Sequence, residues 1–135
     1  MNQDRKTEQN SKARQNNKAM GAFGETVAAK YLRAKGYQII ERNFTCKGGE
    51  IDLIARRKGC LVFVEVKTRQ SDRYGTPAEA VGYTKQKKII SVAQRYLLTY
   101  DEDSDIRFDV IEVYASRSCF GGYKVQQINH IENAF

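Results

Sequence analysis

The chain has 135 residues, of which 41% are hydrophobic and one is proline, so it can form one domain around one core and is neither collagen-like nor of low complexity. Lys and Arg number 23 against 16 Asp and Glu, which gives a net charge of +7. This excess favours a polyanionic partner, such as nucleic acid or an anionic membrane surface, although a basic protein without such a partner would have the same balance.

Residues 1–18 are rich in Asn, Gln, Lys and Arg and almost free of large apolar side chains. Such a segment cannot bury enough apolar surface to offset the entropy of ordering, so we expect a disordered basic tail at 1–18 and a single domain at 19–135. The tail lacks the apolar region of a signal peptide, and no later run approaches the roughly 18 apolar residues of a membrane span. We therefore expect a cytoplasmic protein.

Apolar residues recur at helical spacing from residue 20 to 35, and Gly36 marks the end of this predicted helix. Three β-rich segments at 37–44, 50–56 and 61–68, separated by short glycine-containing turns, predict an antiparallel meander. Thr76 and Pro77 have the form of a helix start, and the second helix is predicted to run to Tyr100. Two more strands are predicted at 106–114 and 123–128. The order α-β-β-β-α-β-β predicts an α/β fold with a central mixed sheet of about five strands flanked by helices.

The cysteine and histidine content argues against several kinds of site. Three scattered cysteines fit reduced, inert thiols, and the single histidine, His130, argues against structural zinc and against a Ser-His-Asp triad. Arg107 and Asp109 alternate with apolar residues on a predicted strand, and we expect them to form an internal ion pair. Tyr74 and Gly75, before the second helix, are expected in a surface loop rather than at a substrate entrance.

Two charged residues stand out on the third predicted strand. Alternation places the valines at 62, 64 and 66 on one face, which belongs to the core, and places Glu65 and Lys67 beside Phe63 on the other. Charges that are half-buried in this way cost several kcal/mol unless they are paired or coordinated. Glu65 and Lys67 therefore need partners.

Asp52 on the preceding strand can face Glu65 across roughly 5 Å of sheet spacing. Two carboxylates that close repel, and a divalent cation between them would relieve the repulsion. Lys67 would then orient or activate a metal-bound water, and Glu25 on the first helix could be a third ligand. The reaction implied is metal-assisted hydrolysis of a phosphodiester. In the alternative interpretation, Glu65 and Lys67 form ordinary ion pairs and Asp52 ends a strand.

Basic residues concentrate in the middle of the chain. Residues 30–95 hold fifteen Lys and Arg against six Asp and Glu, whereas residues 96–135 hold three against seven. Such residues are candidates for phosphate contacts, although a solvated basic face is the alternative for any one of them. The candidates lie in the turn after the Asp52 strand, at the end of the next strand and on the second helix: Arg56, Arg57, Lys58, Arg69, Lys85 and Lys88.

Several motifs together resemble those of the YraN-type family of small uncharacterised bacterial proteins, over residues 20 to 130. They are G-E-x-x-A-x-x-Y-L from Gly24, G-E-I-D-L-I-A from Gly49, F-V-E-V-K-T-R from Phe63, Ala80-Val81 with Lys85, and R-F-D-V-I from Arg107. That family is in turn similar to Holliday-junction resolvases of archaeal type and to the PD-(D/E)XK nucleases.

The resemblance implies a restriction-endonuclease-like core in which Asp52 matches the motif acid, Glu65 the (D/E) and Lys67 the lysine, with Glu25 as the helix-one glutamate of the resolvase-like branch. One departure is Ile51, where the motif has proline. The implied activity is a Mg²⁺ or Mn²⁺ dependent endonuclease acting on DNA, including branched DNA, and the implied assembly is a homodimer. Alternatives are a catalytically silent nucleic-acid-binding module on the same fold, or a protein that docks on an acidic protein partner.

Overall fold

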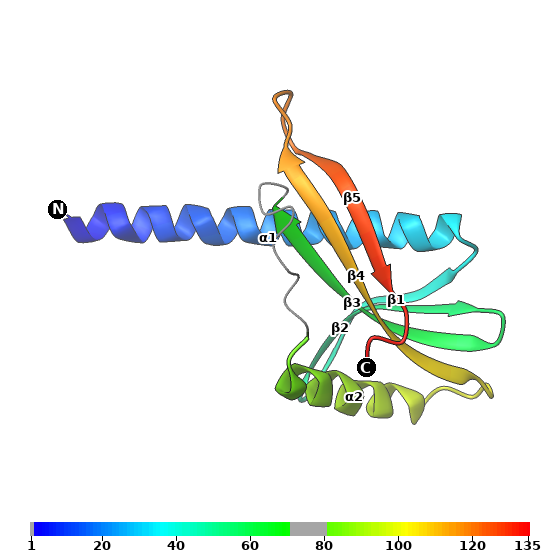
Figure 1. The fold of residues 1–135 in the computed structure, drawn as a ribbon. Coiled ribbons are helices and arrows are strands. Elements are labelled where there is room, and N and C mark those ends of the chain that lie inside the picture. Colours follow the sequence, from blue (N-terminus) through cyan, green and yellow to red (C-terminus); the bar gives the residue numbers. More distant parts are fainter. Residues whose placement is uncertain (1, 71–80) are drawn as a thin grey trace.

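The computed structural model describes residues 2–70 and 81–135, and their elements follow the order α-β-β-β-α-β-β that the sequence predicts (Figure 1). The helices are α1 (Asn2–Ala34) and α2 (Tyr83–Leu97), and the strands are β1 (Gln38–Cys46), β2 (Gly49–Arg57), β3 (Cys60–Gln70), β4 (Asp105–Arg117) and β5 (Tyr123–Ile131). In this part of the chain no helix is long and apolar enough to cross a membrane.

The five strands form one mixed sheet in the order β1-β2-β3-β4-β5. The first three strands pair antiparallel, as the predicted meander requires, and β4 and β5 also pair antiparallel. The central pair, β3 and β4, is parallel. Parallel neighbours need a crossover connection, and α2 lies in it. The protein is therefore an α/β domain with a restriction-endonuclease-like core, as the motifs imply.

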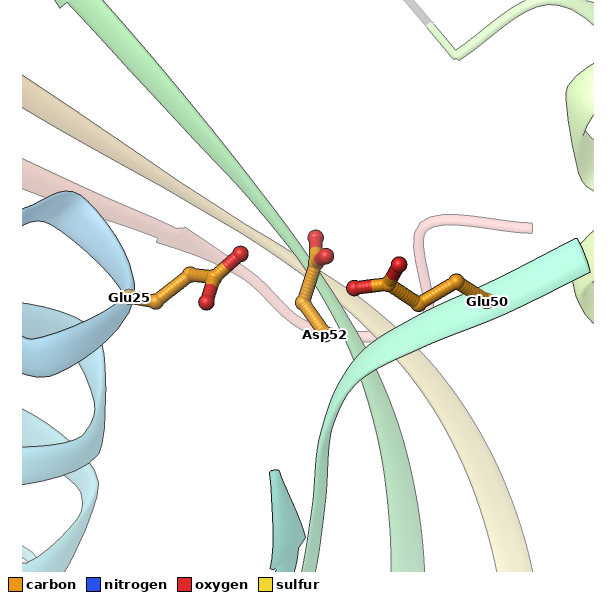
Figure 2. A group of neighbouring side chains, drawn as sticks. All are labelled: Glu25, Glu50 and Asp52. Atoms are coloured by element: carbon orange, nitrogen blue, oxygen red, sulfur yellow. The ribbon is translucent and has the colours of Figure 1, made fainter. Parts of the chain in front are cut away.

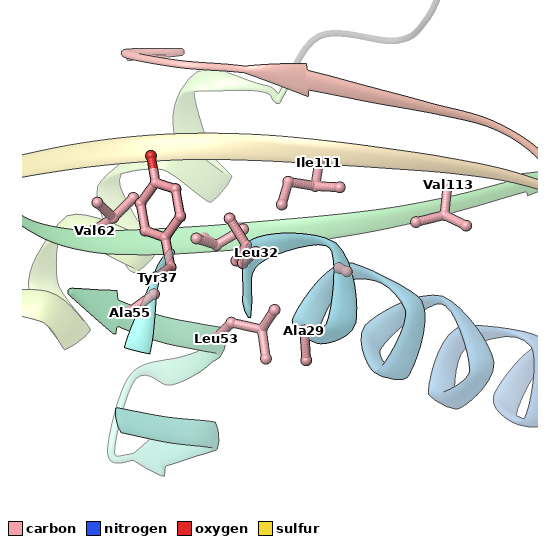
Figure 3. Close-up of a cluster of buried hydrophobic side chains, with 10 residues drawn as sticks. Ala29, Leu32, Tyr37, Leu53, Ala55, Val62, Ile111 and Val113 are labelled. Carbon is pink, nitrogen blue, oxygen red and sulfur yellow. The ribbon is translucent and has the colours of Figure 1, made fainter. Parts of the chain in front are cut away.

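The two helices cover opposite faces of the sheet, and each face has its own apolar core. On the α1 face, Leu32 packs against Leu53, Val62 and Ile111 (Figure 3). On the α2 face, the buried residues come from α2, the segment before it, and three strands: Ile51, Ile54, Leu61, Phe63, Val81, Ile89, Val92, Ala93, Tyr96 and Val110. Because β3 is buried on both faces, its charged residues, such as the buried Glu65, lie where apolar side chains are expected.

Helix α1 begins at Asn2, well before the predicted start at residue 20, so the segment expected to be a disordered tail is helical here. Its first half runs beyond the sheet (Figure 1), and the side chains of residues 5–12 and 14–19 are exposed. The low apolar content correctly indicates exposure. It does not exclude helix, because residues 1–18 contain neither proline nor glycine and place Glu8 four residues before Lys12.

Helix α2 begins at Tyr83, where Gly82 is the N-cap in an extended conformation. Val81 is buried in the core of the α2 face just before the helix, rather than inside it as predicted. The predicted start at Thr76 and Pro77 lies outside the described residues, as do Tyr74 and Gly75.

Candidate active site

Three carboxylates, one from α1 and two from the beginning of β2, lie close together beside the sheet. Glu25 on α1 and Glu50 and Asp52 on β2 each offer an oxygen, and these oxygens lie within 4.8 Å of one another. In Figure 2 the Asp52 side chain points between those of Glu25 and Glu50. The sequence predicted Glu25 and Asp52 at this site but not Glu50. The signal was present, because residues two apart on a strand share a face and Glu50 stands two before Asp52.

Asp52 lies where β2 separates from β3. The paired register ends at Leu53 and Val64, and one more step would pair Asp52 with Glu65. Instead, the Val66 N–H donates a 2.8 Å hydrogen bond to Oδ2 of Asp52. The carboxylate thus replaces a partner in the backbone ladder, and the sheet opens beside it.

Glu25 reaches this opening because α1 lies directly against β3. A Cβ atom on Gly24 would stand 1.8 Å from Oγ1 of Thr68, so only glycine allows the helix to come this close. On the other side of Glu25 is Asn43, whose side chain hydrogen-bonds the Glu25 carboxylate and whose backbone is left-handed, with φ 54°. The position of Glu25 is therefore set by two close contacts.

Glu65 lies next to this group in a pocket of about 340 Å³ that Glu50, Asp52, Lys85 and Lys88 also line. Its side chain is 9% exposed, and Oε1 is 3.3 Å from Nζ of Lys85. Glu65 also shares a hydrogen bond with Asp52. The predicted Asp52 and Glu65 pair is therefore present, with a lysine already beside it.

Burial, together with the negative charge of Glu65, raises the pKa of Asp52 to about 8, although the Val66 N–H opposes the shift. Burial, and more weakly the charge of Glu50, also raises the pKa of Glu25, against the hydrogen bond from Asn43. A divalent cation would stabilise the ionised form of these carboxylates, because it would offset the repulsion between their negative charges. The donors are all oxygens, which is the ligand set that Mg²⁺ and Mn²⁺ prefer.

Lys67 lies two residues after Glu65 on β3 and is half-buried. Strand alternation places it on the same side as Glu65. Within residues 2–70 and 81–135 its ammonium has no hydrogen bond or ion pair, unlike that of Lys85. Lys67 is thus the free cation of the strand that carries Glu65.

The predicted phosphate-binding residues lie in three places: the pocket, the turn after β2 and, for Arg69, β3. Lys85 and Lys88 line the pocket with the acids. The turn after β2 lies at the other end of that strand, since four residues from Asp52 to Arg56 span roughly 13 Å. There Arg56 forms an ion pair with Glu102, and the guanidinium of Arg57 lies over the Tyr37 ring at 5.4 Å. Lys58 forms the turn itself, with a left-handed φ of 50°.

Two half-buried arginines, Arg69 and Arg107, are each paired with a buried carboxylate of β4. Nε of Arg69 is 2.9 Å from a carboxylate oxygen of Glu112, which is itself buried. The predicted internal pair of Arg107 and Asp109 is confirmed, at 2.8 Å, and Nε2 of His130 lies 2.7 Å from the same aspartate. Burial alone would raise the pKa of Asp109, but the bonds from His130 and Arg107 hold it below its usual value. This network is structural.

The match to a family model decides the relationship of this chain to known proteins. The model of the uncharacterised protein family UPF0102 matches residues 24–113, which include every acid of the site together with Lys67, Lys85 and Lys88. The chain belongs to UPF0102. The resemblance to the YraN-type family is thereby confirmed.

Curated UPF0102 proteins match most of the chain. One from Caldanaerobacter subterraneus subsp. tengcongensis is 50% identical over 121 residues, which cover 89% of this chain and 97% of the relative. Another, from Alkaliphilus oremlandii, is 49% identical over 88% of this chain and 99% of the relative. A third, from Clostridioides difficile, is 47% identical over 89% and 99%. The UPF0102 relatives therefore share the whole domain rather than one motif.

Proposed function

We propose that this UPF0102 protein is a metal-dependent endonuclease that hydrolyses phosphodiester bonds in DNA. The observation that carries the proposal is the meeting of Glu25, Glu50 and Asp52 within 4.8 Å, beside Glu65. A purely structural role would place each acid against its own basic partner, as Glu112 is placed against Arg69. Here three acids face one another.

Each charged residue of the site has a role in this proposal. Glu25, Glu50, Asp52 and Glu65 would hold Mg²⁺ or Mn²⁺, which when bound polarises a phosphate oxygen and lowers the pKa of a bound water. Lys67, which has no competing partner in the described chain, positions the attacking water and stabilises charge on the phosphate.

Lys85 and Lys88 bind the substrate phosphates at the pocket rim. Both belong to the start of α2, where the free backbone N–H groups of the helix also favour an anion. Lys85 must leave Glu65 to do so. Its side chain is 54% exposed and can turn to solvent, whereas the Glu65 carboxylate, 9% exposed, would then need the metal as its partner.

The substrate class follows from charge and the resemblance. The basic residues that line the pocket are the lysines Lys85 and Lys88, and ammonium groups suit binding to the phosphate backbone rather than to sequence. We propose DNA rather than RNA, with branched DNA as a preferred form and a homodimer as the form that cuts two strands.

The test is a cleavage assay on plasmid, single-stranded and four-way-junction DNA with Mg²⁺, with Mn²⁺ and with a chelator. Cleavage is expected only with metal, and Glu65→Gln and Lys67→Ala should each abolish it. Glu102→Gln, which alters an exposed acid paired with Arg56 at the other end of β2, is the matched control and should cleave normally. Cleavage that persists in the Glu65 and Lys67 variants would come from a contaminant.

One observation favours a second candidate, a nucleic-acid-binding module that keeps the fold without chemistry. Lys85 lies 3.3 Å from Glu65 and neutralises a carboxylate that the enzyme needs for metal. This candidate gives DNA affinity that falls with salt at a log-log slope near −0.9 per phosphate contact, and no product with any metal. Calorimetric titration of Mn²⁺ separates the two, since the module should bind none.

A further inference from the structure

The β4–β5 hairpin extends past the rest of the sheet as a two-stranded arm (Figure 1). The last pair between β3 and β4 is Gln70 with Ala115, whereas β4 and β5 stay paired as far as Arg117 and Tyr123. Residues 113–131 contain no Asp or Glu. Both basic residues of the arm, Arg117 and Lys124, are exposed. The arm is therefore a positively charged projection.

A tightly bonded turn holds an aromatic ring at the tip of this arm. The Ser118 N–H donates to the Gly122 carbonyl at 3.0 Å, and the Gly121 N–H donates to the Ser118 carbonyl at 3.1 Å. The Phe120 N–H donates to the Ser118 hydroxyl at 3.2 Å. Left-handed φ values of 96° and 71° at the two glycines close the turn. Phe120 is 97% exposed on a turn that these three hydrogen bonds hold in shape, so its ring is available to a partner.

The arm is braced against α1. The Tyr123 ring lies 5.4 Å from that of Phe23, and its hydroxyl donates to the Asn16 carbonyl at 3.3 Å. A second pocket, of about 210 Å³, lies between α1 and β3 and is lined by residues from Asn17 to Glu25. This pocket adjoins the acid cluster through Glu25 and extends along α1 as far as Asn17, next to the residue that Tyr123 contacts.

We propose that the tip of the arm binds single-stranded nucleic acid, with Phe120 stacking on an unpaired base and Arg117 and Lys124 contacting the neighbouring phosphates. The choice of partner rests on the proposed function. Stacking on an exposed ring suits any base, and nearby cations suit the backbone. The exposed basic residues of the free half of α1 extend the same charge: Arg5, Lys6, Lys12, Arg14 and Lys18.

The register of the sheet sets the reach of this contact. Glu65 is level with Val110, and Arg117 lies seven residues farther along β4, which is roughly 23 Å at strand spacing. That span equals about seven base pairs of duplex DNA at a rise of ~3.4 Å per pair. The preferred substrate should therefore have unpaired bases about that far from the cleaved bond, so the hairpin would select DNA in which a duplex borders a single strand.

The test measures affinity without catalysis. Fluorescence anisotropy in a chelator at low salt compares the full-length protein on a single strand and on a blunt duplex of about 20 nucleotides, long enough to span the contact. Phe120→Ser and Phe120→Leu should each weaken binding of the single strand about tenfold, since both remove the ring. Phe120→Trp should keep the affinity. Leu98→Ser is the matched control, because Leu98 is 86% exposed beyond the end of α2.

Two outcomes would overturn the proposal. Phe120→Ser could leave single-strand affinity unchanged, or Phe120→Leu could bind as well as wild type, which would make the contact apolar rather than stacked. If sedimentation showed that Phe120→Ser abolished self-association while affinity stayed constant, the tip would be a contact between two copies. Because the assay contains no free metal, its result is independent of whether the acid cluster cleaves DNA.

Discussion

The backbone N–H of Val66 donates to Oδ2 of Asp52 at 2.8 Å, at the point where β2 and β3 stop pairing. One carboxylate therefore both ends a strand pair and faces Glu25 and Glu50. The site depends on Asp52 lying at this point, because strands β2 and β3 separate there. If they stayed paired past Asp52, no space would remain between them for the other acids.

The raised pKa of Asp52 predicts a pH dependence of stability in the absence of metal. The folded state holds the Asp52 proton up to about pH 8, whereas the unfolded chain releases it near the ordinary value of 3.8. Because the folded state binds more protons across this window, the free energy of unfolding should fall as pH rises from about 4 to about 8. Denaturant titrations at several pH values should show this slope, and Asp52→Asn should flatten it. An equal slope in the variant would assign the effect to another group.

Gly24 should be intolerant of a side chain. Gly24→Ala brings a methyl group into Thr68, and the overpacking should cost about 1–3 kcal/mol of stability and displace Glu25. Gly21→Ala is the control in the same helix, because a Cβ there meets nothing within 4 Å. Since alanine favours helix over glycine, that change should stabilise by roughly 0.5–1 kcal/mol. Thermal melts of both variants test the pair, and similar melting temperatures would contradict the close packing.

Glu50 should contribute to metal binding although its side chain is exposed. Glu50→Gln removes one of three facing carboxylates, and we expect Mn²⁺ affinity to fall by about tenfold or more. Glu41→Gln changes an exposed glutamate of β1 that is outside the cluster and should leave the affinity unchanged. Calorimetry provides the measurement. Equal affinities for the two variants would remove Glu50 from the site.

Lys85 should compete with metal for Glu65. Lys85→Gln frees the carboxylate, so Mn²⁺ should bind more tightly, whereas DNA should bind more weakly because a phosphate contact is lost. Lys87→Gln is a suitable control, since Lys87 lies over the Tyr83 ring at 4.6 Å and does not line the pocket. Opposite changes in the two affinities would distinguish competition from a general loss of positive charge.

The order of the helices and strands was predictable because local patterns of apolar residues indicate each element, whereas the restriction-endonuclease-like core was implied by the family resemblance. Alternation in residues 61–68 identified the central strand, and the structure buries both of its faces. The pairing of Asp52 with Glu65 followed from the same alternation. The extent of α1 did not, because an exposed helix and a disordered tail have the same lack of apolar residues.

The basic residues that lie near the acids were harder to predict, because their positions depend on the direction of each strand and on which elements pack together. Arg56 stands only four residues from Asp52 in sequence, yet an extended strand carries it to the far end of the sheet, where Glu102 binds it. Lys85 is far from Glu65 in sequence and lies against it. Density of charge along a sequence therefore indicates a basic protein, but it does not locate the phosphate-binding surface.

Helix α1 should behave as two segments with different local stability. From residue 20 it packs on the sheet through buried residues such as Ala28 and Leu32, whereas the side chains of residues 5–12 and 14–19 are exposed and Tyr123 contacts this half through the Asn16 carbonyl. A helix of that length with so little packing is marginal in water. Amide hydrogens before residue 20 should therefore exchange with solvent orders of magnitude faster than those after it, and protection of that half on adding a polyanion would report binding directly.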